Sequence, residues 1–93
     1  MEKIIELKSM ELADILGIGD GHIKLIESNI PVSITARGDL IKIKGSSSDI
    51  NQANSILNEM RGTLSSKGSL FSADVDNLIK LYKTEELDIN KNI

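Results

Sequence analysis

The spacing of apolar residues changes at Pro31, the only proline in this chain of 93 residues. Over 12–30, apolar residues recur every three or four positions, whereas over 32–43 they alternate with polar ones. Helical spacing then returns after position 48. The first spacing is typical of an α-helix and the second of a strand with one buried face. The sequence therefore predicts an α+β fold.

The same patterns place the individual elements. We expect a strand over 3–7, helices over 9–16 and 20–30, a β-hairpin over 32–44 that turns at Gly38 and Asp39, a long helix over 48–64 and a last helix over 72–82. The predicted N-caps are Ser9, Asp20, Ser48 and Ser72, because their oxygens can accept hydrogen bonds from a first helical turn. The stretch 65–68 is expected to be flexible. Three strands backed by helices on one face give a two-layer sandwich in the order βααββα plus a C-terminal helix.

Apolar faces of the helices and the hairpin form the expected core. The second helix contributes Ile23, Ile26 and Ile30, and the last helix contributes Val75, Leu78, Ile79 and Tyr82. The first helix contributes Leu12, Ala13, Ile15 and Leu16. The hairpin contributes Val32, Ile34, Ala36, Ile41 and Ile43. The long helix contributes Ile50, Ala53, Ile56, Leu57, Met60 and Leu64.

Composition excludes several classes of function. There is no cysteine and only one histidine, His22, so neither a zinc knuckle nor a multi-histidine metal site is expected. Phe71 and Tyr82 are the only aromatic residues, too few for a platform that stacks bases. No nucleophile, base and orienting group can be assembled, so we predict no catalytic residue. The N-terminus does not resemble a signal peptide and no apolar run has the length of a membrane span, so a cytoplasmic protein that does not bind membranes is expected.

The densest cluster of glycines is the stretch GIGDGHIKLIE at 17–27. It lacks the lysine and hydroxyl residue of a P-loop, and it follows a helix, whereas a dinucleotide fingerprint follows a strand. It is therefore predicted to be a turn between two helices. Such a turn can be a plain connection, or its backbone N–H groups can contact an anionic ligand, because the first N–H groups of a helix lack intrahelical partners. The residues leave both interpretations open.

Four further features have a structural and a functional interpretation. Lys42 and Lys44 share the polar face of their strand, with Arg37 nearby, and can form a basic strip for phosphates, although a solvated face is favoured. The net charge of −3 gives no overall attraction for nucleic acid. His22, in the first turn of its helix, can hydrogen-bond a phosphate or a base, although a plain surface histidine is favoured. The Arg-Gly-Asp tripeptide at 37–39 has the sequence of an adhesion motif, but a turn is favoured. Asp74 and Asp76 fit the positive end of a helix dipole better than a catalytic pair.

The order of these segments resembles a KH RNA-binding domain, whose GXXG loop clamps a nucleic-acid backbone. More narrowly, four segments resemble the N-terminal KH-like domain of PhoH-family, phosphate starvation-inducible ATPases. They are LGIGDGHIKLIE, VSITARGDLIKIKG, INQANSILNEM and DVDNLIKLY, which lie in 12–82, about three quarters of the chain. The sequence departs from the GXXG pattern at Asp20, whose carboxylate repels phosphate unless it is turned inward as a cap.

The resemblance implies a KH-like domain over 1–83 and a linker over 84–93 toward a P-loop ATPase domain that this chain does not contain. It implies a non-catalytic domain that contacts or orients single-stranded RNA for that ATPase, with ATP and magnesium as ligands of the other domain and no cofactor here. The RNA-contacting residues would be Gly17, Ile18, Gly19, Asp20, Gly21, His22, Lys24, Arg37, Lys42 and Lys44. The alternative is a structural module that docks on the ATPase domain or mediates homo-oligomerisation without binding nucleic acid.

Overall fold

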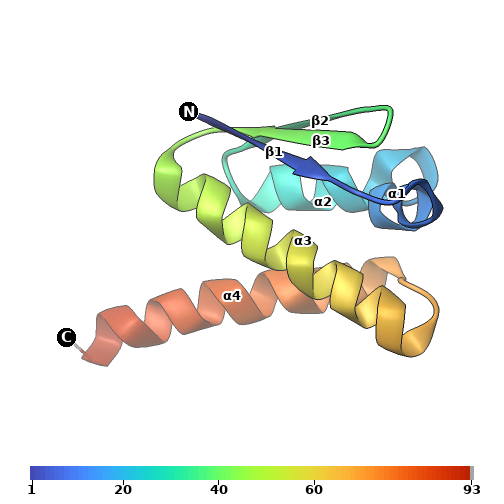
Figure 1. The fold of residues 1–93 in the computed structure, drawn as a ribbon. Helices are drawn as coiled ribbons and strands as arrows, with labels where there is room; N and C mark the ends of the chain where they lie inside the picture. The colour runs from blue at the N-terminus through green and yellow to red at the C-terminus, as the bar shows by residue number, and fades with distance from the viewer. Residues whose placement is uncertain (93) are drawn as a thin grey trace.

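The computed structural model describes residues 1–92, with side chains placed for 1–8 and 10–83, and it has the α+β architecture expected from the sequence (Figure 1). Its elements are β1 (Glu2–Glu6), α1 (Ser9–Leu16), the 3₁₀ turn η1 (Ile18–Asp20), α2 (Gly21–Asn29), β2 (Ser33–Arg37), β3 (Leu40–Lys44), α3 (Ser47–Lys67) and α4 (Ser72–Asn92). All helices lie on one side of the sheet, and α4 packs on α2 and α3. The predicted fold class is confirmed, and the arrangement is compatible with a KH-like sandwich.

The sheet has the strand order β1-β3-β2, with both pairs antiparallel. Lys42, in the central strand, lies opposite Ile4 of β1 and Thr35 of β2. The hairpin between β2 and β3 turns at Gly38, whose φ of 56° is a conformation that glycine adopts without steric cost. The hairpin is as predicted, and β1 is displaced by one residue from the expected strand.

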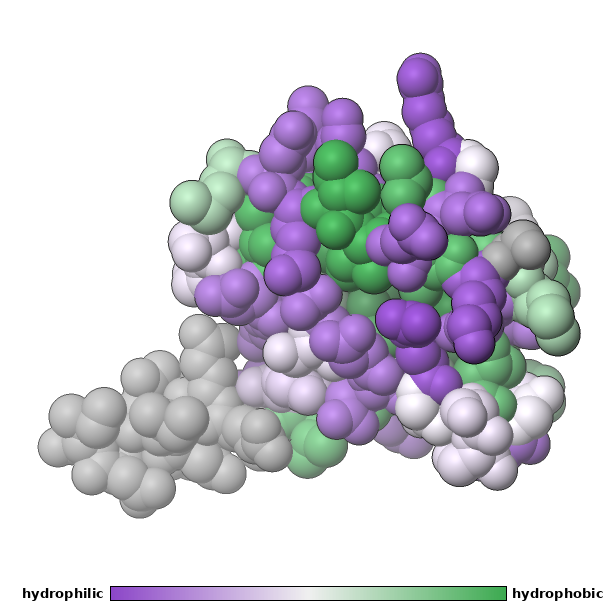
Figure 2. Space-filling model, in the orientation of Figure 1, coloured by the Kyte–Doolittle hydropathy of each residue, from purple (hydrophilic) through white to green (hydrophobic). Residues whose placement is uncertain are grey.

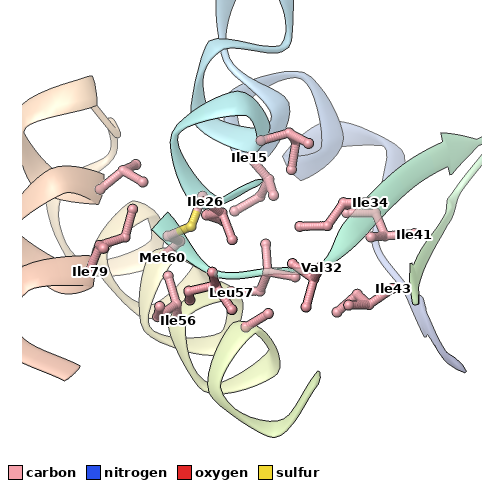
Figure 3. Packing of buried hydrophobic residues seen from close by; sticks show 14 of the residues in the cluster. Ile15, Ile26, Val32, Ile34, Ile41, Ile43, Ile56, Leu57, Met60 and Ile79 are labelled. Carbon is pink, nitrogen blue, oxygen red and sulfur yellow. The ribbon is translucent and has the colours of Figure 1, made fainter. Parts of the chain in front are cut away.

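The core lies between the sheet and the helices and consists mainly of isoleucine (Figure 3). The predicted stripe on α3 is confirmed, because Ile50, Ala53, Ile56, Leu57 and Met60 are buried and Leu64 is partly buried. Two predicted core residues, Ala13 and Ala36, are exposed. Ala13 is two positions before the buried Ile15, and such residues point to nearly opposite sides of a helix, about 200° apart. Ala36 lies beside the hairpin turn, at the end of the sheet.

Two helices begin differently from the prediction. The N-cap of α3 is Ser46 rather than Ser48, and the Ser46 hydroxyl accepts a hydrogen bond of 3.2 Å from the N–H of Asp49. Ser48 is already inside the first turn, whereas Ser46 keeps the extended backbone that a cap requires. The N-cap of α1 is Lys8 rather than Ser9, and it makes no side-chain cap bond.

The long helix continues through the stretch 65–67, which was predicted to be flexible. It ends at Gly68, whose φ is 77° and whose N–H donates to the carbonyl of Leu64 at 2.8 Å. A glycine with positive φ directly after the last turn is a common helix stop. The glycine therefore sets the end of α3, while the two serines before it remain helical.

At the start of α4, the capping contact comes from Asp74 rather than from the predicted Ser72, which is the first residue of the helix. One carboxylate oxygen of Asp74 accepts a hydrogen bond of 2.9 Å from the N–H of Phe71, and the other lies 2.9 Å from Lys67 Nζ. These contacts lower the pKa of Asp74 below its ordinary value of 3.8, the Phe71 hydrogen bond most strongly. The carboxylate joins the end of α3 to the start of α4.

The lowered pKa predicts a component of acid denaturation. As pH falls, the unfolded chain binds a proton at this position before the folded chain does, so stability present above pH 3.8 is lost as pH falls through the lower folded-state pKa. We expect Asp74→Asn to be less stable than the natural chain at neutral pH and to lose less stability between about pH 5 and about pH 2.5. Urea unfolding across this range measures both effects, with Asp76→Asn as the control. Parallel acid profiles for Asp74→Asn and the natural chain would contradict the prediction.

The backbone of α4 remains helical through Asn92, so the part of the predicted linker that the structure describes, residues 84–92, is helix. Whether it leads to another domain stays a prediction. No helix within residues 1–92 is long and apolar enough to cross a membrane.

Candidate nucleic-acid interface

The glycine-containing turn has an unusual backbone path. Gly17 follows α1 with a φ of 78°, and Gly19 and Asp20 have φ values of 59° and 58°. The turn is closed by a hydrogen bond of 3.2 Å from the N–H of Asp20 to the carbonyl of Gly17, and α2 begins at Gly21. Residues with a Cβ rarely adopt positive φ. The connection between α1 and α2 thus requires glycines whether or not it binds a ligand.

The carboxylate of Asp20 does not cap α2, contrary to the prediction. Asp20 occupies the N-cap position but makes no side-chain hydrogen bond to the helix. Capping side chains normally belong to residues with an extended backbone, and Asp20 is left-handed. Its side chain is exposed, so its negative charge stays at the surface of the turn.

His22 is buried, and the prediction of a surface histidine is wrong. Only 5% of the residue is exposed, and its Nδ1 lies 2.9 Å from the carbonyl oxygen of Asp14 in α1. Because a carbonyl only accepts, the ring donates this hydrogen bond. The ring also lies against Gly17, where an added Cβ would come within 2.7 Å of it. His22 therefore joins α2 to α1 and is not available to a phosphate.

A shallow hollow lies beside the turn and includes residues from the α3–α4 connection. Its lining consists of Ala13, Asp14, Gly17, Ile18, Gly21, His22, Leu70, Phe71 and Ser72. Ile18 is fully exposed, at 101%, and Phe71 is 64% exposed. Among the described residues that line the hollow there is no lysine or arginine. We call the surface formed by this hollow and the adjacent Asp20 the turn face; it is apolar and acidic.

A second hollow lies on the open side of the sheet, away from the helices. We call it the sheet face; its lining is Ile4, Ser33, Thr35, Arg37, Leu40, Lys42 and Lys44. In the part of the chain that the structure describes, Arg37, Lys42 and Lys44 form no ion pair. Ile4 and Leu40 are exposed among the polar groups. Hydrophilic side chains also surround a hydrophobic area on the sheet side of the molecule in Figure 2.

The predicted interface residues divide between these two surfaces. Gly17, Ile18, Gly21 and His22 line the hollow of the turn face, with Gly19 and Asp20 in the same turn, whereas Arg37, Lys42 and Lys44 line the sheet face. The two hollows share no lining residue. Lys24 is exposed on α2 and lines neither hollow. The cations are therefore separate from the turn that they were expected to assist.

Sequence reasoning missed several residues of both surfaces. On the sheet face these are Ile4, Ser33, Thr35 and Leu40, which the alternation of the strands places on the polar side with Lys42. That alternation was a usable signal. Phe71 and Leu70 lie about 50 positions from the turn in the chain, and no local pattern indicates that α3 and α4 bring them beside it.

Comparison of the chain with protein-family models, curated proteins and solved structures finds no match. Among the described residues, no group of three or more His, Cys, Asp or Glu side chains is placed to hold a metal ion. The charge and shape of the two surfaces are therefore the features that indicate a function.

Proposed function

We propose that this chain is the non-catalytic KH-like accessory domain of a PhoH-like ATPase, and that it contacts single-stranded RNA through the sheet face. The observation that carries the RNA contact is the cluster of Arg37, Lys42 and Lys44, which form no ion pair within the described residues. Ser33 and Thr35 add hydroxyl groups opposite Lys44 and Lys42. Guanidinium, ammonium and hydroxyl groups are the usual side-chain partners of phosphate and sugar oxygens.

The same surface predicts the character of the binding. It carries no aromatic residue on which a base can stack, so contacts would be to the backbone and tolerant of sequence. Three cations displace few counterions, and the slope of log affinity against log salt should be about −2. Weak, sequence-tolerant binding suits a domain that positions RNA for a neighbouring ATPase.

Phosphate binding is unfavourable at the turn and at the outer edge of its neighbouring strand, β2, because both lie near carboxylates. Asp14 and Asp20 are exposed beside the turn. At the outer edge of β2, a carboxylate oxygen of Glu27 accepts a hydrogen bond of 2.9 Å from the N–H of Ile34. Carboxylates thus lie both at the turn and between α2 and β2, where like-charge repulsion opposes a phosphate backbone. The open side of the sheet also has carboxylates, those of Glu2 and Glu6 in β1, which lie opposite Lys44 and Leu40. The sheet face carries cations, however, whereas the hollow of the turn face has none among its described lining residues, and that difference supports the sheet face over the turn.

Reversing the charge of Lys42 tests this proposal. We expect Lys42→Glu to weaken binding of a labelled single-stranded oligouridylate about tenfold and to flatten the salt slope, because one phosphate contact becomes a repulsion. Lys24→Glu, which makes the same change in net charge at an exposed site on α2, should lower affinity no more than about threefold. Fluorescence anisotropy titrations at several salt concentrations provide the measurement, and circular dichroism checks that each variant is folded.

Equal losses for the two variants would show that net charge, not the sheet face, governs binding. If the natural chain does not bind the oligonucleotide, the RNA proposal is wrong.

The second candidate, an interaction module, is favoured by a separate observation. Ile18 and Phe71 are both exposed and line the same hollow of the turn face. The described lining residues of that hollow include no cation. An apolar side chain exposed at the tip of a turn is better suited to contact a protein partner than to contact RNA.

A further inference from the structure

We infer, resting on the RNA contact proposed above, that the RNA backbone runs along β2 and β3 of the sheet face and is kept off β1 by the carboxylates of Glu2 and Glu6. This path deepens the proposed function, because it states which part of the surface the RNA uses and whether the RNA follows the strands or crosses them. The three strands carry different charges on their open side, and that difference determines the path.

Strand pairing arranges the open side of the sheet in three rows, each crossing β1, β3 and β2 in that order. Side chains on one side of a sheet are two residues apart along each strand. The first row is Glu2, Lys44 and Ser33, the second is Ile4, Lys42 and Thr35, and the third is Glu6, Leu40 and Arg37. Lys42 is half-buried and the other residues of the rows are exposed. The rows therefore show which charges each strand presents.

On this side of the sheet, β1 presents carboxylates and no cation. Glu2 and Glu6 flank Ile4, whereas Lys3 lies opposite the buried Ile43 and belongs to the other side of the sheet. In the described part of the chain neither carboxylate forms an ion pair. A phosphate above Ile4 would lie about 7 Å along the strand from each carboxylate, which is within the screening length of about 10 Å at 0.1 M salt. The β1 edge therefore repels a phosphate backbone.

The other two strands present the cations and the hydroxyl groups. Lys42 and Lys44 are in β3, and Ser33, Thr35 and Arg37 are in β2. Neither strand contains an Asp or a Glu. Neighbouring strands lie about 4.8 Å apart, so these groups form a narrow strip of phosphate-binding side chains that one RNA backbone can follow.

Carboxylates lie on both sides of this strip and at one end. Glu2 and Glu6 lie on the β1 side, and Glu27 of α2 lies on the other side, where it accepts the hydrogen bond from the N–H of Ile34. At the end of the strip, the exposed Asp39 is in the hairpin turn. An RNA that crosses the strands passes carboxylates at both edges, whereas an RNA that follows them stays beside the cations. The charges therefore favour a path along the strands.

Thr35 and Ile4 provide a matched test of this path, because both are exposed and both lie directly opposite Lys42, one on each side. Each is replaced by Glu and by Gln, which are similar in size and differ in charge. The ratio of the two Kd values for the labelled oligouridylate then measures the effect of the charge at that position. We expect a ratio of about tenfold for Thr35→Glu over Thr35→Gln, and of no more than about twofold for Ile4→Glu over Ile4→Gln. Circular dichroism checks folding, and the same two substitutions at Ser33 replace those at Thr35 if they do not fold.

A second measurement tests whether the carboxylates are the cause. With Glu2→Gln and Glu6→Gln in place, the ratio at position 4 should rise to about fivefold, because the RNA is no longer repelled from β1. The control is Glu59→Gln, at an exposed site on α3, which should leave that ratio unchanged.

Equal ratios at positions 4 and 35 would overturn the inferred path, as would a ratio at position 4 that stays low after both carboxylates are neutralised. Either result would leave the RNA proposal standing as long as Lys42→Glu weakens binding. If neither the natural chain nor the two glutamine variants bind the oligouridylate, the RNA proposal is wrong and the path is wrong with it.

Discussion

Replacing Ile56 by alanine is expected to lower the free energy of unfolding by about 3 kcal/mol. The side chain has no exposed surface and lies on α3, which packs against β3, α1 and α4. Because three other elements hold α3 in place, we expect the site to collapse only in part, so the loss includes a cavity term as well as lost burial. For a domain of this size the whole stability is about 5 to 14 kcal/mol, so the change removes a large fraction of it.

Ile4→Ala is the matched control for this prediction. It deletes the same atoms, but from a residue on the sheet face that is 55% exposed, and it should change stability by no more than about 0.5 kcal/mol. Urea unfolding followed by circular dichroism measures both variants. Similar losses at the two positions would mean that the packing of α3 against its neighbours is not as described.

Replacing Gly17 by alanine is expected to cost about 3 kcal/mol, roughly one for positive φ and roughly two for overpacking. The new Cβ would lie 2.7 Å from Cγ of His22 and 2.9 Å from two further ring atoms. The ring cannot move aside without losing its hydrogen bond to the carbonyl of Asp14. The substitution therefore strains both the turn and the contact between α1 and α2.

Gly19→Ala separates the two contributions. Gly19 has a φ of 59°, but an added Cβ would meet no atom within 4 Å, so the cost should be only about 1 kcal/mol. Combining Gly17→Ala with His22→Ala should cost less than the sum of the single changes, because the smaller side chain makes room. Additive losses, or equal losses at the two glycines, would contradict the role assigned to the His22 ring.

The glycines of the turn show which features a local sequence pattern can predict and which it cannot. Their spacing predicted a tight connection between two helices, and the connection is where it was expected. The purpose of Gly17 was not predictable, because the ring that it accommodates comes from the next helix and approaches through tertiary packing. The same packing buries His22. Its burial was not predictable, because His22 is a polar residue next to Ile23 and is not part of the apolar spacing of α2.

By itself, the sequence determined the fold class, the hairpin and the buried stripe of α3, because each depends on a period that is set by backbone geometry and repeated over many residues. Only the tertiary structure decided that the cations lie on a surface separate from the turn, and that Phe71 lines the same hollow as Ile18. Those relations depend on how whole elements are placed by packing between residues far apart in the chain, as in the ion pair of Glu11 with Arg61. A local pattern specifies which side of an element is buried, but not which other element covers it.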